Sequence, residues 1–214
     1  MSYHSRIESA FSPAKETFET LWLSLLRKES QHQRFFIASV HGGDGATTVA
    51  ACAAIGLARH LSEPVVLIEA NIKNPGLAFQ MSLPGAPGFV ELMRGEAPLE
   101  DVTHGTGVPG LSCVCAGGPN AGSLGGNRRL QEILGELEHE YRVIVFDAGP
   151  ILPYSDSSLL LQYVDEAILV ASAGKTRDQD ILKAAQIISA SETPLVGTVL
   201  NFYRKEVPTW VAAE

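Results

Sequence analysis

Residues 34–58, RFFIASVHGGDGATTVAACAAIGLA, decide the fold of this 214-residue chain. An apolar run is followed by a glycine-rich turn and an alanine-rich segment, a pattern typical of a buried strand, a tight turn and a helix. In such a turn the backbone N–H groups converge on an anion, and a lysine before the hydroxyl residue adds a positive charge. Ala46 occupies that lysine position, directly before Thr47. The stretch therefore predicts a phosphate-binding turn that lacks its usual cation.

Apolar runs and helical stripes alternate along the rest of the chain. Strands are predicted over 34–39, 65–68, 111–115, 143–147, 167–171 and 194–200. Helices are predicted over 47–61, 88–94, 127–141, 155–163 and 177–191, and the remainder of 81–126 is expected to be ordered loop. Unbroken apolar strands separated by helices indicate a doubly wound, mainly parallel α/β sheet with helices on both faces.

The organisation expected is a flexible arm over 1–14, a single domain over 15–205 and a short tail over 206–214. An amphipathic helix is predicted over 15–29, with an apolar stripe formed by Phe18, Leu21, Trp22, Leu25 and Leu26. This stripe packs either on the same domain or on a partner, and the first is the favoured interpretation.

Composition excludes several classes of protein. The chain is 45% hydrophobic and 19% charged, as ordinary globular proteins are, and its formal charge of −8 disfavours nucleic acid or an anionic membrane as a partner. No apolar run approaches the roughly 20 residues that span a bilayer, and the first residues lack the apolar core of a signal peptide. We therefore expect a cytoplasmic protein without direct membrane insertion. The three cysteines are interpreted as small buried hydrophobes, because no histidine cluster joins them.

Polar groups follow the ends of several predicted strands. The segment Glu69–Lys73 follows the second strand, Asp147 ends a later one, and Asn201 follows the last. Ligands of open α/β sheets bind at the carboxyl ends of the strands, so these groups and the glycine turn are predicted to share one crevice.

Three motifs give the chain a family resemblance: ASVHGGDGATT at 38–48, VVLIEANIKNPGL at 65–77 and VIVFDAGPILPYSD at 143–156. They resemble the phosphate- and magnesium-binding motifs of the cytoplasmic kinase domain of bacterial tyrosine kinases, which are related to the MinD and ParA ATPases. That family has the P-loop NTPase fold, uses ATP and Mg²⁺, and acts with membrane chain-length regulators in capsule and exopolysaccharide export. The resemblance runs from about residue 16 to residue 201.

The resemblance implies functional residues at the matching positions. The residues implied to bind ATP or ADP, if a nucleotide binds, are Gly42, Gly43, Asp44, Gly45, Ala46, Thr47, Thr48, Lys73 and Asn201. Thr47 and Asp147 are the implied Mg²⁺ ligands, and Glu69 and Asp147 are the residual catalytic carboxylates.

The chain departs from the family where the chemistry should be. The family's phosphate-binding lysine is Ala46, and its Asp-x-Asp-x-Arg motif is Glu69-Ala70-Asn71-Ile72-Lys73. The MinD and ParA class places another lysine at the position of His41, interpreted here as a solvated loop residue. The family's Glu-x-x-Arg-x-x-Arg motif of the N-terminal helix corresponds to residues 16–22, without either arginine, and its tyrosine-rich tail is not matched. We expect little or no kinase turnover and at most weak nucleotide binding, with Lys73 or Lys175 as replacement cations.

Three hypotheses follow from the resemblance. The first is a pseudokinase that serves as regulatory partner of a membrane polysaccharide chain-length regulator, held at the inner membrane through that partner and assembling with itself or with a relative through the 15–29 helix. The second is an active ATP-dependent tyrosine kinase with an atypical pocket. The third, a MinD- or ParA-like positioning ATPase, is disfavoured by the acidic charge and by the missing signature lysine.

Overall fold

The computed structural model describes residues 25–26, 31–118, 127–152 and 156–203. The predicted helix over 15–29 thus lies outside the described residues except for Leu25 and Leu26, as do the arm over 1–14 and the tail over 206–214. Both leucines are partly buried against the apolar cluster that includes Phe35 and Ile37. At these two positions the chain packs on its own core, as the favoured interpretation required.

The strands of the described residues form one sheet because most of them are apolar along their whole length. Their bounds are β1 Gln33–Ser39, β2 Val65–Glu69, β3 Thr103–Gly105, β4 Leu111–Val114, β5 Val143–Pro150, β6 Glu166–Ser172 and β7 Leu195–Asn201. Every residue of β2 and β6 is buried, which is the pattern of a strand covered on both faces.

The strand order is β3-β4-β2-β5-β1-β6-β7. All neighbouring strands pair in parallel except β3 and β4, which are antiparallel. The strand β1 lies between β5 and β6, so the chain leaves β1 toward one side of the sheet and later returns to its other side. A ligand crevice forms at such a switch of direction, outside the carboxyl ends of the strands.

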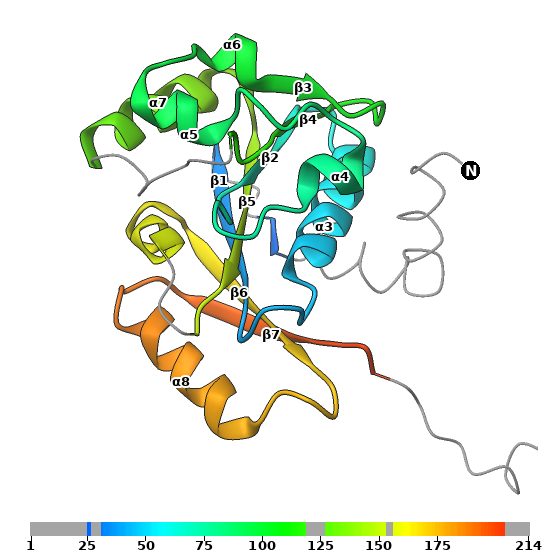
Figure 1. Ribbon diagram of the computed structural model, residues 1–214, viewed down its shortest axis with the longest axis vertical. Coiled ribbons are helices and arrows are strands. Elements are labelled where there is room, and N and C mark those ends of the chain that lie inside the picture. The colour runs from blue at the N-terminus through cyan, green and yellow to red at the C-terminus, as the bar shows by residue number, and fades with distance from the viewer. Residues whose placement is uncertain (1–24, 27–30, 119–126, 153–155, 204–214) are drawn as a thin grey trace, which may run out of the picture.

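Helices cover both faces of the sheet, as Figure 1 shows. The remaining elements are α3 Ala46–His60, α4 Leu77–Met81, α5 Phe89–Arg94, α6 Leu99–Val102, α7 Asn127–Glu140, the 3-10 helix η2 Asp156–Tyr163 and α8 Asp178–Ser189. One apolar layer joins the sheet to α3 and α4, and the other joins it to α5, α7, η2 and α8. The predicted doubly wound α/β fold is confirmed, and it is the P-loop NTPase fold.

Two apolar clusters make up the core. Phe35, Ile37, Val65 and Leu67 belong to the cluster on the α3 face, where the alanines of α3 let the helix approach the sheet closely. Phe36 and Phe146 alternate with them and face α5 and α7. Alternation along the strands thus supplies both layers of the core.

The segment 81–126 is the part of the fold that the sequence predicted least well. Besides the expected helix and strand, it contains α6 and the short strand β3, which pairs with β4 at the edge of the sheet. The helix α4, just before it, was not predicted either. These elements are five residues or shorter, so they are too brief to show a hydrophobic period.

Cys52, Cys113 and Cys115 are buried and free of disulfides, as predicted. No helix among the described residues has the length and apolar character needed to cross a membrane.

Two glycines allow a test of this architecture by a matched pair of substitutions. A Cβ atom on Gly88 would lie 2.4 Å from the Cys115 carbonyl oxygen and 2.5 Å from the Gly117 nitrogen, so Gly88→Ala forces α5 away from β4. We expect a loss of roughly 1–3 kcal/mol of unfolding free energy. Gly135, within α7, has open space at the same position. Gly135→Ala should therefore add about 1 kcal/mol. Urea denaturation of both variants decides the point, and a stable Gly88→Ala protein would contradict the packing described.

Candidate phosphate-binding site

A pocket of about 500 Å³ lies at the carboxyl ends of β1 and β5. It is lined by the glycine turn and the start of α3 (Gly42, Gly43, Gly45, Ala46, Thr47, Thr48), by the segment after β2 with α4 (Asn71, Asn74, Gly76, Gln80), and by strand ends (Ser39, Gly149, Pro150). None of these lining residues carries a charge. A crevice thus lies at the predicted edge of the sheet, with a polar but uncharged lining. Of the strand-end groups predicted to share it, Asn71 lines the pocket, and the side chains of Glu69, Lys73, Asp147 and Asn201 are not part of the lining.

The glycine turn has the conformation that an anion-binding loop requires. Gly43 and Gly45 have φ angles of +86° and +96°, a region that residues with a side chain rarely adopt. Gly45 directly precedes α3, and its carbonyl accepts the Val49 N–H at 3.0 Å. The first N–H groups of this 15-residue helix have no partner within the helix, and its first residues line the pocket. The positive end of the helix dipole thus adjoins the pocket.

Asp44 is fully buried and holds the turn together. Its Oδ2 accepts the His41 N–H at 2.8 Å, and its Oδ1 accepts the Thr176 hydroxyl at 3.2 Å. Its carbonyl accepts the Asn201 side-chain N–H at 2.9 Å. Asp44 and Asn201, both predicted to bind nucleotide, therefore fix the loop to β7 and to the turn after β6, and neither is part of the pocket lining.

Asp147 is the buried carboxylate of the site. Within the described residues, no hydrogen bond of ordinary geometry reaches either of its side-chain oxygens. Burial, the largest effect, raises its pKa to about 7; the Glu69 charge raises it further, while Thr47 and the Gly149 N–H, which lie close by, lower it. A buried carboxylate that lacks a partner beside a threonine hydroxyl fits a hard cation such as Mg²⁺, which prefers oxygen ligands.

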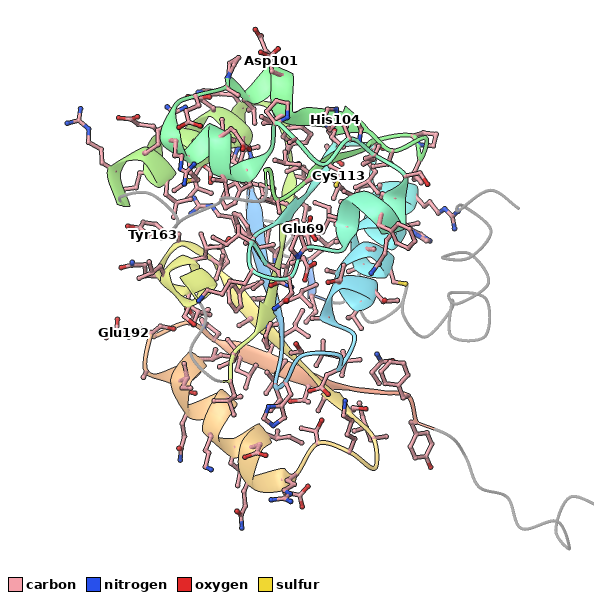
Figure 2. All side chains as sticks on the ribbon, in the orientation of Figure 1. Glu69, Asp101, His104, Cys113, Tyr163 and Glu192 are labelled. Atoms are coloured by element: carbon pink, nitrogen blue, oxygen red, sulfur yellow. The ribbon has the colours of Figure 1, made fainter. Side chains whose placement is uncertain are left out.

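Glu69 has a structural task. Its Oε1 accepts the N–H groups of Gly76 and Leu77 at the start of α4, at 2.5 and 2.7 Å, and its Oε2 accepts the Ala116 N–H at 3.1 Å. Burial raises the pKa of Glu69, and these three backbone bonds oppose the shift. Figure 2 shows Glu69 inside the molecule near α4, and it does not line the pocket. Its predicted catalytic role stays a prediction without a contact to support it.

Asn71 does reach the pocket. Its side-chain N–H donates to the Asn74 carbonyl at 2.9 Å, and its amide lies against Gly149, where a Cβ atom would come within 2.6 Å of the Asn71 Cγ. Gly149 has a φ of +70°, so both its backbone conformation and the close Asn71 side chain favour glycine at this position. Lys73 is exposed and lies outside the lining.

Two basic residues stand near the turn. His41 places its Nε2 3.2 Å from the Asp180 Oδ2 on α8, with 40% of the His41 side chain exposed, so it is both partly solvated and paired. The exposed Lys175, in the turn between β6 and α8, places its ammonium 3.8 Å from where a Cβ atom on Gly43 would lie.

The sequence did not single out Gln80, Asn74 or Thr176. Gln80 belongs to the unpredicted α4, and Asn74 was quoted only within a motif. The bond of Thr176 to Asp44 joins residues 132 positions apart, which no local sequence pattern reveals.

No family profile matches the sequence. Curated relatives are nevertheless found. The chain is 26% identical over 175 residues to the tyrosine-protein kinase YwqD of Bacillus subtilis, covering 81% of this chain and 73% of the relative. It is 25% identical over 210 residues to the tyrosine-protein kinase CpsD of Streptococcus agalactiae, covering 95% and 90%.

Solved structures agree with these relatives. The kinase domain of VpsO superposes with a TM-score of 0.75 and 28% identity, over 94% of this chain and 98% of that one. The septum site-determining protein MinD of Pyrococcus horikoshii, solved with Mg-ADP, shares the fold at 22% identity and a TM-score of 0.66, over 84% and 76%. The resemblance to bacterial tyrosine kinases, with MinD-like proteins as structural neighbours, is confirmed.

The three backbone bonds to Glu69 predict a cost when its charge is removed. In Glu69→Gln the new NH₂ group faces an N–H donor that then has no acceptor, and we expect a loss of roughly 1–3 kcal/mol of unfolding free energy. Glu63→Gln, at an exposed position, is the control and should change stability by less than about 0.5 kcal/mol. Equal effects of the two substitutions in urea titrations would show that Glu69 does not hold α4.

The raised pKa of Asp147 predicts that the stability of the folded chain depends on pH. Since its folded pKa, about 7, lies above the ordinary value of 3.8, the folded chain keeps a proton that the unfolded chain has lost between those values. Its contribution to stability is therefore largest at low pH and falls as the pH rises to about 7. Asp147→Asn removes this dependence, so the variant should gain on the wild type by up to a few kcal/mol between about pH 4 and pH 7 and hold the gain above. A stability difference that does not vary with pH would refute the shift.

Proposed function

We propose that this homologue of the bacterial tyrosine kinases is a kinase-like protein with little or no phosphoryl-transfer activity, which acts as a regulatory partner in capsule or exopolysaccharide synthesis or export. One observation carries the proposal. The glycine turn keeps the shape of a phosphate site, yet Ala46 occupies the lysine position, and the pocket lining carries no charge. The site is thus shaped for an anion but poorly equipped to stabilise a transition state.

The missing charges decide the expected rate. Phosphoryl transfer depends on positioning and on charge neutralisation, and loss of one cationic stabiliser can lower the rate by about 10³ to 10⁵. Asn71 replaces a motif carboxylate, and its amide is already bonded to the Asn74 carbonyl. The chain therefore lacks the lysine of the glycine turn and one acidic group for the metal.

What remains suits binding better than catalysis. The bound species would be ATP or ADP, with its phosphates at the N–H groups of residues 42–48, and Thr47 and Asp147 would hold Mg²⁺. The metal ion would supply neutralisation of phosphate charge. The buried, unpartnered oxygens of Asp147 support this assignment.

The partner that we propose is the cytoplasmic part of a membrane polysaccharide chain-length regulator, which would keep this chain in the cytoplasm, peripheral to the inner membrane. Support comes from the likeness to tyrosine-protein kinases over 95% of the chain. The segment over 15–29, which contains Trp22, is proposed to make this contact or to assemble with another copy.

An active ATP-dependent tyrosine kinase is the alternative function. The observation that favours it is the Lys175 ammonium beside Gly43, which offers a displaced cation to the site. The two functions differ in turnover.

Incubation with ATP and Mg²⁺ separates them. We expect phosphate release and phosphotyrosine formation to stay at the level of an Asp147→Ala control, because the lysine of the glycine turn and one metal-binding carboxylate are missing. Release above that level, together with ATP binding tighter than about 100 μM, would establish the active kinase and end the proposal of an impaired one.

The substitution Ala46→Lys tests whether the backbone N–H groups of the glycine turn can still bind a phosphate. Ala46 lines the pocket, so a lysine there can extend toward a bound phosphate. A charge-assisted contact of about 1.5–3 kcal/mol should raise ATP affinity roughly ten- to hundredfold, measured by calorimetry. Ala46→Met, of similar length but uncharged, is the control. No gain for the lysine variant over the methionine variant would mean that the turn does not present its N–H groups to an anion.

A further inference from the structure

The geometry points to Lys175 as the residue that supplies positive charge to the terminal phosphate of a nucleoside triphosphate in the glycine turn, in place of the lysine missing at Ala46. The inference deepens the nucleotide-binding part of the proposed function and rests on it. Lys175 comes from the turn between β6 and α8, far along the chain from Ala46.

The position of the ammonium is the first argument. A Cβ atom on Gly43 would have the Lys175 Nζ, at 3.8 Å, as its neighbour within contact distance. Gly43 lines the pocket, so the ammonium lies beside the wall of the anion site. Lys175 itself does not line the pocket, but its flexible four-carbon side chain allows the ammonium to approach a phosphate bound beside Gly43.

The backbone around Lys175 is held against the glycine turn, which is the second argument. The Thr176 hydroxyl donates to the buried Asp44 carboxylate and accepts the Ser172 N–H at 2.9 Å. The Ala173 N–H donates to the Asn201 carbonyl at 2.8 Å. The residues on both sides of Lys175 are thus fixed, so its reach toward Gly43 does not depend on a mobile loop.

The charge of Asp44 is the third argument. Its carboxylate is fully buried and bonds to two neutral donors, the His41 N–H and the Thr176 hydroxyl. This negative charge sits inside the turn and repels an incoming phosphate. No hydrogen bond or ion pair engages the Lys175 ammonium within 31–118, 127–152 and 156–203, so its charge is available to offset that of Asp44.

Lys73 is the other cation near the pocket, and the geometry separates the two. Both side chains are exposed. Of the two, Lys175 is the one whose ammonium approaches a glycine of the turn. Lys175 is therefore the cation assigned to the site.

The experiment measures ATP binding to the full chain with Mg²⁺ by calorimetry, for the wild type and for Lys175→Ala, Lys175→Arg and Lys183→Ala. Lys183 is an exposed lysine of α8 that pairs with Asp180, so its removal changes the net charge equally. Losing a charge-assisted contact should weaken ATP binding about ten- to hundredfold in Lys175→Ala. Lys175→Arg should retain most of the affinity, and Lys183→Ala should stay within about twofold of the wild type.

A double variant adds an independent readout. In Ala46→Lys with Lys175→Ala, the loop lysine replaces the lost charge, and binding should return to at least the wild-type level. Thermal unfolding of each variant shows that the chain is folded, which the exposure of Lys175 favours.

The outcomes are distinct. Equal binding by Lys175→Ala and Lys183→Ala overturns the inference, and so does a wild-type chain that binds no ATP at millimolar concentration. Phosphate release by the wild type would instead overturn the proposed loss of activity, and it would leave the assignment of Lys175 to be decided by the same binding ratios.

Discussion

The buried carboxylate of Asp44 is the contact on which the phosphate site depends. It joins the backbone of the glycine turn to the turn after β6, while its own carbonyl receives the side chain of Asn201 at the end of β7. Leaving a buried carboxylate without hydrogen bonds is unfavourable, so the His41 N–H and the Thr176 hydroxyl stabilise this arrangement of the two turns. The loop can therefore hold its shape without a lysine and without a bound phosphate. Glycines at positive φ show a preserved shape, and they do not measure catalytic competence.

Glu69 is a second residue at a motif position whose contacts are structural. As the first acid of a metal-binding motif it would face the pocket, but here its longer side chain accepts N–H groups from the start of α4 and from the segment after β4. Glu69 thus connects the start of α4 to the segment after β4. The helix α4 in turn supplies Gln80 to the pocket lining. An acidic residue at a motif position has thus kept its charge type while its hydrogen-bond partners are structural.

The sequence predicted the sheet well because strands buried on both faces are continuous apolar runs, as 65–68 and 167–171 are. It placed the glycine turn, Thr47 and Asn71 at one crevice, since strand ends of a parallel sheet meet at one edge. It could not give the direction of the Glu69 carboxylate, because burial and backbone partners depend on α4, whose five residues carry no periodic signal. Likewise it offered Lys73 and Lys175 as equal substitutes for the missing cation. Only the packing of the turn after β6 against Gly43 distinguishes them.

We propose that Ala46 and Asn71, the two pocket residues that depart from the family motifs, are linked by electrostatics. Removing a lysine from a site with two metal-binding carboxylates would leave uncompensated negative charge in a buried place, where charges are costly. In this chain Asn71, which is not acidic, occupies the position of the second motif acid. Burial raises the pKa of the remaining carboxylate, Asp147, to about 7, so Asp147 is partly protonated near neutral pH. Protonated Asp147 carries no charge, which lowers the penalty of burying this side chain without a partner. On this proposal, Ala46 and Asn71 act together on the charge balance of the site: where no lysine is present at position 46, an amide at position 71 leaves one buried negative charge fewer beside Asp147.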